Sequence, residues 1–162
     1  MKKILLLSVL LLNLNAKAQR FEDYFTDATL RIDYTFSGKT KNQEIALDKL
    51  NRSPRWYGKR RRLTEVPVEG NGQIIVRDHR SDSIIYKNSF STLFQEWLSY
   101  DEAKTTPRSF ENVFLVPMPK DTIDVTLTLY DNRQKPMASI HHQVVPTDIL
   151  IRKIGYDRQT PH

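Results

Sequence analysis

Two segments of the sequence alternate apolar and polar residues almost without a break, and they constrain the fold more than any other feature. The segments are Thr29–Ser37 and Asp121–Tyr130. Every second residue is apolar: Leu30, Ile32, Tyr34 and Phe36 in the first, and Ile123, Val125, Leu127 and Leu129 in the second. Successive side chains of a strand point to opposite faces of a sheet. Each segment therefore predicts a strand with one buried face, and the two faces need a layered fold to cover them.

The stretch Asn88–Pro119 holds many of the aromatic residues of the chain and predicts a helix followed by a strand. Its first half has apolar residues with the spacing of one helical stripe, at Phe90, Leu93, Phe94, Trp97 and Leu98. We expect Ser89 to cap this helix through its side-chain oxygen. The second half, 110–116, is apolar on both faces, which predicts a central strand that Pro117 and Pro119 stop.

Further strand patterns occupy 43–50, 73–78, 83–88, 137–145 and 149–154. The charged side of 43–50 predicts an edge strand. The turn residues 79–82 predict a hairpin between 73–78 and 83–88, whereas 20–27 is a helical turn or an ordered arm. No alternation of strands and long helices is present. We predict an all-β fold, a two-layer antiparallel β-sandwich that is immunoglobulin-like in shape, with one short helix near 90–98.

The first 18 residues have the three parts of a secretory signal peptide. A basic start at Lys2 and Lys3 precedes an apolar run, and Ala16-Lys17-Ala18 is a cleavage site between Ala18 and Gln19. The run is too short for a membrane span, and no cysteine offers a lipoprotein anchor. We therefore expect export to the periplasm or the exterior, a single sandwich domain over 19–154, and a polar tail or the start of a linker over 155–162.

The residue types that carry most enzyme chemistry are sparse. There is no cysteine, and the four histidines include no H-E-x-x-H pair. His141 and His142 are neighbours on a predicted strand, so their side chains point to opposite faces. Neither G-x-S-x-G nor a glycine-rich phosphate loop is present. We predict no catalytic residue, no metal site and no cofactor in this chain.

The most distinctive polar feature is the run Arg55-Trp56-Tyr57-Gly58-Lys59-Arg60-Arg61-Arg62. Arginines offer planar donors and aromatic rings offer stacking area, so the run is a candidate docking surface for an acidic protein face or an anionic glycan. The residues of this candidate are Arg55, Trp56, Tyr57, Lys59, Arg60, Arg61 and Arg62. The alternative is a solvated loop in which Trp56 plugs the edge of the sandwich. We expect no nucleic-acid partner, because the signal peptide predicts export and because half of the net charge of +6 belongs to that peptide.

Several runs resemble the N-terminal, non-catalytic domain of the M64 family of secreted bacterial zinc metallopeptidases, the immunoglobulin A peptidase family. They are 89–97 and 108–117, with 21–25, 70–74 and 147–152. The resemblance implies an accessory domain whose partner in the same chain is a catalytic metallopeptidase domain. Zinc would then belong to the catalytic domain, and none of the family's zinc ligands lies in the matched runs.

A second function stays open from the sequence alone. The chain is alternatively a free-standing exported β-sandwich that binds a glycan or a protein. A reading frame that continues past His162 into an H-E-x-x-H segment favours the accessory domain, whereas a natural stop codon there favours the free-standing module.

Overall fold

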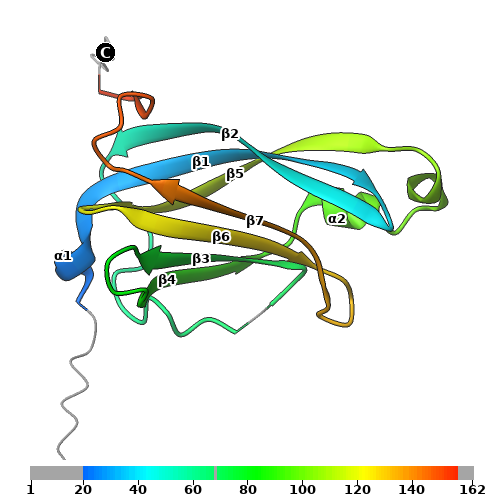
Figure 1. The fold of residues 1–162 in the computed structure, drawn as a ribbon, viewed down its shortest axis with the longest axis horizontal. Helices are drawn as coiled ribbons and strands as arrows, with labels where there is room; N and C mark the ends of the chain where they lie inside the picture. Colours follow the sequence, from blue (N-terminus) through cyan, green and yellow to red (C-terminus); the bar gives the residue numbers. More distant parts are fainter. Residues whose placement is uncertain (1–19, 68, 157–162) are drawn as a thin grey trace, which may run out of the picture.

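The computed structural model describes residues 20–67 and 69–156, which form two packed β-sheets (Figure 1). The first sheet has the order β5-β1-β2-β8 and the second has the order β4-β3-β6-β7. The strands of the first sheet are β5 (Arg108–Pro119), β1 (Phe25–Lys39), β2 (Asn42–Pro54) and β8 (Arg152–Lys153). Those of the second are β4 (Ile84–Phe90), β3 (Gly72–Asp78), β6 (Ile123–Tyr130) and β7 (Pro136–Val144). The helical elements are α1 (Phe21–Tyr24), α2 (Leu93–Trp97) and the 3₁₀ turn η1 (Asp101–Lys104).

The predicted fold class is confirmed: the chain is mostly β and its sheets form a two-layer sandwich. All strand pairs are antiparallel except β2 with β8, which run parallel through Asn51 and Arg52. Over the rest of its length β2 is the outer strand of its sheet, as its charged side predicts. Within the described residues, no helix has the length and apolar character that crossing a membrane requires.

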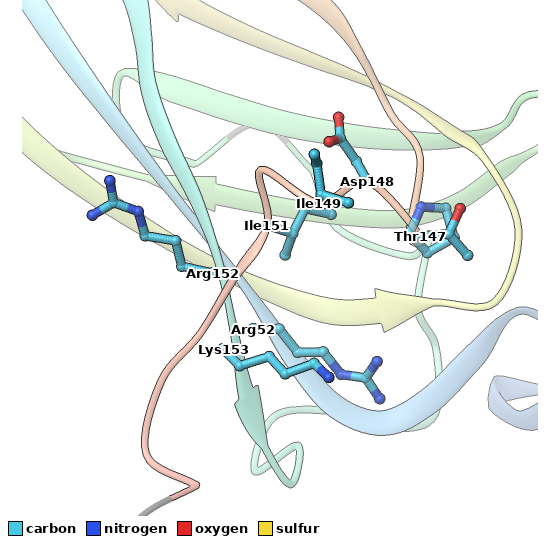
Figure 2. Close-up of a pocket in the computed structure, with 8 residues that line it drawn as sticks. Arg52, Thr147, Asp148, Ile149, Ile151, Arg152 and Lys153 are labelled. Atoms are coloured by element: carbon cyan, nitrogen blue, oxygen red, sulfur yellow. The ribbon is translucent and has the colours of Figure 1, made fainter.

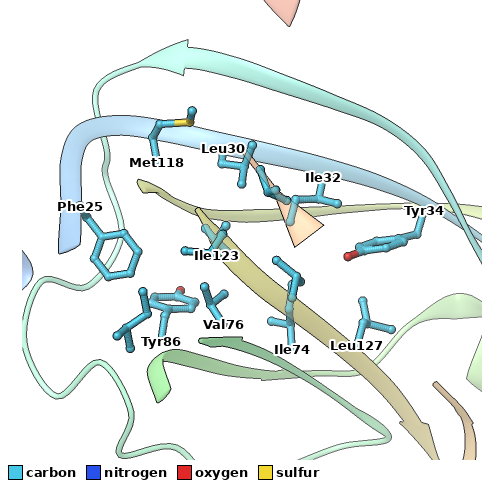
Figure 3. Close-up of a cluster of buried hydrophobic side chains, with 14 of the residues drawn as sticks. Phe25, Leu30, Ile32, Tyr34, Ile74, Val76, Tyr86, Met118, Ile123 and Leu127 are labelled. Atoms are coloured by element: carbon cyan, nitrogen blue, oxygen red, sulfur yellow. The ribbon is translucent and has the colours of Figure 1, made fainter. Parts of the chain in front are cut away.

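The core lies between the sheets and is built by the alternating segments (Figure 3). The inward residues of β1 and β6 are at most 1% exposed, namely Leu30, Ile32, Tyr34, Phe36, Ile123, Val125, Leu127 and Leu129. Ile74 and Val76 of β3, which neighbours β6 in the second sheet, complete this core. Burial of this kind is the main stabilising contribution to the fold.

Helix α2 is shorter than predicted and begins later. Thr92, not Ser89, is its N-cap, and Thr92 and Gln95 form a reciprocal capping box. Ser89 and Phe90 instead extend β4, because the Phe90 ring packs 4.5 Å from the ring of Phe114. The same ring lies against Gly72, where a Cβ atom would come within 2.2 Å of it. The predicted stripe is only partly buried, because Leu93 is 72% exposed.

Strand β5 is at the edge of its sheet, so the prediction of a central strand is wrong. It pairs with β1 only, and Val113 and Leu115 on its outer face are 49% and 54% exposed. Pro117 lies within the strand instead of stopping it, whereas Pro119 is its last residue. Proline has no N–H to donate to a neighbouring strand, and an edge strand tolerates this loss on its outer side.

A polar pair lies inside the sandwich where β1 faces β7. The Tyr34 hydroxyl and His142 Nε2 share a hydrogen bond of 2.6 Å, whereas His142 Nδ1 is buried without a hydrogen-bond partner. Burial lowers the pKa of His142 from its ordinary value of 6.5, and the neighbouring His141 lowers it further. As predicted, His141 points to the other face, where it is exposed.

This pair predicts a loss of stability in acid. Because the pKa of His142 is lower in the folded chain, the unfolded chain binds more protons below about pH 6.5. The stabilisation that comes from keeping His142 neutral is thus complete above pH 6.5. It is lost as the pH falls through the pKa of His142 in the folded chain. We expect the urea midpoint of the wild type to drop between pH 7.5 and 5.5, and to drop less in His142→Gln. His141→Gln is the matched control, and a pH dependence unchanged by His142→Gln would refute this assignment.

Candidate docking surface

The basic loop, Arg55–Arg62, follows β2 and covers the free edge of β4. Lys59 Nζ donates to the carbonyl of Lys87 over 2.7 Å, and the Lys87 N–H donates to the carbonyl of Leu63 over 2.8 Å. The Lys59 ammonium also lies 5.0 Å from the centre of the Tyr86 ring. Burial lowers the pKa of Lys59. An exposed strand edge invites pairing with other chains, so this part of the loop protects the fold.

Trp56 belongs to the core, which removes it from the predicted docking residues. Its side chain is 7% exposed and packs edge-on against Tyr86, with ring centres 6.2 Å apart. The indole Nε1–H donates to the carbonyl of Lys59 over 3.0 Å. The structure therefore places Trp56 as the plug that the alternative interpretation of the loop describes.

Arg60 is tied to the start of β1 and to α1. Its guanidinium forms an ion pair with Asp27, donates to the carbonyl of Trp56 over 3.2 Å and lies 4.7 Å from the centre of the Phe21 ring. The backbone N–H of Trp56 and the side chain of Arg60 both lower the pKa of the Asp27 carboxyl group. Arg60 thus holds the loop in place and has fewer free donors for a partner.

Four of the predicted docking residues are exposed and lie apart from these anchoring contacts: Arg55, Tyr57, Arg61 and Arg62. Of these, Arg62 forms an exposed ion pair of 3.7 Å with Glu65. Tyr57 is 84% exposed. Arg55 and Arg62 have left-handed backbone conformations, with φ of 64° and 51°. The Arg55 carbonyl accepts a hydrogen bond of 2.8 Å from Thr29 Oγ1, which fixes the start of the loop on β1.

Exposure predicts that Arg61→Ser with Arg62→Ser has little effect on folding. Surface substitutions away from special contacts change the free energy of unfolding by about 0.5 kcal/mol or less. We expect the double variant to unfold at the wild-type urea concentration, and the addition of Arg60→Ser to lower that midpoint. A large loss from the double variant alone would show that these side chains have structural contacts. The absence of any further loss on adding Arg60→Ser would contradict the role given to its contacts.

The chain leaves the sandwich beside the start of the basic loop. Strand β8 lies parallel to the end of β2, and the Ile154 N–H donates to the carbonyl of Arg52 over 2.9 Å. Figure 1 shows that this exit lies at the same end of the sandwich as α1. We call the residues that this end presents the exit surface: Arg52, Arg55, Tyr57, Ile149, Leu150, Arg152 and Lys153.

An ordered turn exposes two apolar side chains on the exit surface. Asp148 Oδ1 accepts a hydrogen bond of 2.8 Å from the Leu150 N–H, and the Asp148 carbonyl accepts one of 3.1 Å from the Ile151 N–H. Ile151 is 8% exposed and anchors the turn, whereas Ile149 is 94% exposed and Leu150 is 75% exposed. The prediction of a strand over 149–154 is therefore too long, because the strand β8 includes only Arg152–Lys153. Pro146-Thr147-Asp148 is the turn signal in the sequence that the strand prediction overlooked.

A surface hollow of about 660 Å³ opens in the exit surface (Figure 2). Its lining residues are Arg52, Pro146, Thr147, Asp148, Ile149, Ile151, Arg152 and Lys153. The hollow thus combines three cationic side chains with an apolar wall. Sequence reasoning did not identify it, because Arg52 and Lys153 are about a hundred residues apart and meet only through the β2–β8 pair.

The histidines give no metal centre in the described part of the chain. His79 Nδ1 lies 2.7 Å from one carboxylate oxygen of Asp124, and His141 Nε2 lies 3.9 Å from the other. No group of three or more His, Cys, Asp or Glu side chains in residues 20–67 and 69–156 is placed to hold a metal ion. These donors do not fit the zinc ion of a metallopeptidase, and the three side chains form a polar cluster at the surface.

The comparison with protein families identifies the domain. The sequence model of the family described as Peptidase M64 N-terminus matches residues 20–140. The chain belongs to this family. The match covers α1, the basic loop and most of both sheets, and it ends at Ile140, before the exit segment. A search of curated proteins found no match. The predicted cleavage site at Ala18 and Gln19 lies outside the described residues.

Proposed function

We propose that this M64 N-terminal domain is the non-catalytic accessory domain of a secreted zinc metallopeptidase, and that its exit surface packs against the catalytic domain. Two observations together carry the proposal. The chain belongs to the M64 N-terminal family, and an ordered turn exposes Ile149 and Leu150 where the chain leaves the sandwich. Exposed apolar side chains grouped with polar ones are typical of protein interaction sites.

The composition of the exit surface supports a protein partner. Tyrosine and arginine are enriched at protein interfaces, and this surface contains Tyr57 with Arg52, Arg55 and Arg152. Zinc and its ligands belong to the catalytic domain in this proposal. The accessory domain then positions the catalytic domain or its protein substrate, and residues 1–18 direct the chain out of the cytoplasm.

A peptidase assay tests the non-catalytic part of the proposal. The chain expressed from Gln19 is expected to cleave neither casein nor immunoglobulin A, with or without added zinc, and to carry no stoichiometric zinc by elemental analysis. Zinc near one ion per chain, or cleavage that a chelator abolishes, would contradict the proposal. The reading frame after His162 supplies the second test, in which an H-E-x-x-H segment supports the accessory role and a natural stop codon favours the free-standing binding module.

A further inference from the structure

Among the described residues, two cations face each other across the β2–β8 pair without an anion between them. Arg52 and Lys153 occupy paired positions of the parallel strands. Figure 2 shows their side chains extending side by side in one direction, whereas Arg152 points the other way. Like charges directly opposite each other on neighbouring strands destabilise a sheet. Such a pair is favourable when an anion lies between the two groups.

The described residues supply no such anion. Neither Arg52 nor Lys153 has an ion-pair partner within residues 20–67 and 69–156, and Arg52 Nε is buried without a hydrogen-bond acceptor. Asp148 also lines the hollow, but one oxygen of its carboxylate accepts the Leu150 N–H, and Figure 2 shows the group pointing away from Arg52. A buried donor without an acceptor costs free energy, so an acceptor beside the Arg52 guanidinium would be favourable.

The shape and lining of the hollow indicate which kind of anion fits it. A volume of about 660 Å³ exceeds what one inorganic ion fills and lies within the range of about 300–1,000 Å³ found for ligand pockets. Pro146, Ile149 and Ile151 form an apolar wall beside the cations. The lining has no aromatic ring on which a sugar could stack. The guanidinium fork of arginine matches a carboxylate group, which it binds through two parallel hydrogen bonds.

We propose that Arg52 and Lys153 bind a carboxylate side chain of a docking polypeptide, whose neighbouring apolar residue lies against Ile149 and Ile151. The partner segment therefore has an apolar residue next to an acidic one. This inference rests on the proposed function, because it takes the partner of the exit surface to be a polypeptide.

A short acetylated and amidated peptide of alternating leucine and glutamate is the probe. Its binding to the chain expressed from Gln19 is followed through the Arg52 Nε–H signal in ¹H–¹⁵N NMR spectra, beside a control peptide in which glutamine replaces glutamate. We expect the glutamate peptide to shift this signal and the glutamine peptide to leave it in place. Added salt should weaken the binding. Since no catalytic domain is present, a negative result would overturn this inference and leave the proposed function standing.

Matched variants test the two cations. Arg52→Gln with Lys153→Gln is expected to weaken binding of the glutamate peptide by about tenfold or more, since hydrogen bonds to charged groups are the strong ones. Lys41→Gln with Arg133→Gln changes the net charge equally at turns far from the hollow, and should bind like the wild type. Lys153→Gln alone, at an exposed position, gives the same test if the double variant fails to fold.

Three outcomes would overturn the inference. The first is equal binding of the glutamate and glutamine peptides. The second is wild-type affinity in both Arg52→Gln with Lys153→Gln and Lys153→Gln alone. The third is a shift of the Arg52 signal by a sulfated heparin oligosaccharide but not by the glutamate peptide, which would assign the hollow to a glycan.

Discussion

Trp56→Ala is expected to lower the free energy of unfolding by about 3–5 kcal/mol, the range for removing a large buried aromatic side chain. Trp56 lies in a run that looks like a solvated basic loop, yet its ring is 7% exposed and packs against Tyr86. The substitution also removes the hydrogen bond from the indole to the Lys59 carbonyl. Without the Trp56 ring and this hydrogen bond, the loop should detach from the edge of β4. Urea denaturation followed by circular dichroism measures the change in the free energy of unfolding.

Tyr57→Ala is the matched control for Trp56→Ala. The two aromatic residues are neighbours in the same loop, but Tyr57 is 84% exposed. We expect Tyr57→Ala to change the free energy of unfolding by about 0.5 kcal/mol or less. Equal losses from the two variants would contradict the division of the basic loop into an anchored part and an exposed part.

The second large effect is expected from Trp97→Ala, again about 3–5 kcal/mol. Trp97 ends α2, is 6% exposed and packs between two rings, with centres 6.1 Å from Phe94 and 5.8 Å from Phe110. Its removal leaves a cavity between α2 and β5 that the short helix cannot fill by shifting without giving up its capping box. The free energy of unfolding from urea titrations gives the loss directly.

Leu93→Ala in the same helix separates burial from helix formation. Leu93 is 72% exposed, so its truncation removes little buried surface, and alanine is the best helix former. We expect a change of about 0.5 kcal/mol or less. A loss below about 1 kcal/mol for Trp97→Ala would show that the ring contacts of α2 do not stabilise the domain.

The parts of the fold that follow from side-chain alternation could be predicted. An alternating strand such as β1 or β6 buries one face whatever its neighbours are, so Ile32 and Val125 are in the core as expected. The turn between β3 and β4 is likewise local, and its hairpin was predicted correctly. Both features depend only on residues close together in the sequence.

The wrong predictions concern features that depend on distant residues. Phe90 has helical spacing to Phe94, but its ring packs against Gly72 and Phe114. These contacts are made when Phe90 belongs to β4. Strand β5 looks central because Val113 and Leu115 are apolar, although no strand of the described residues pairs with its outer edge. Periodicity cannot show which apolar faces find a partner.

The candidate site was predicted only in part for the same reason. The basic run identified exposed residues such as Arg61, but it did not show that Trp56 and Arg60 are engaged in the fold. The hollow beside Arg52 depends on the pairing of β2 with β8, which no local pattern indicates. The exposure of Ile149 follows from the Asp148 turn.

Hydrogen–deuterium exchange with a catalytic domain tests the central claim most directly. The chain expressed from Gln19 is mixed with the separately expressed catalytic domain of an M64 peptidase that carries this N-terminal domain, and amide exchange is compared with that of the chain alone. We predict slower exchange in 145–156 and 52–57, and unchanged exchange in the β6–β7 turn at 131–135. Protection at that turn without protection at the exit surface, or no protection anywhere, would contradict the proposal that this end of the sandwich packs against the catalytic domain.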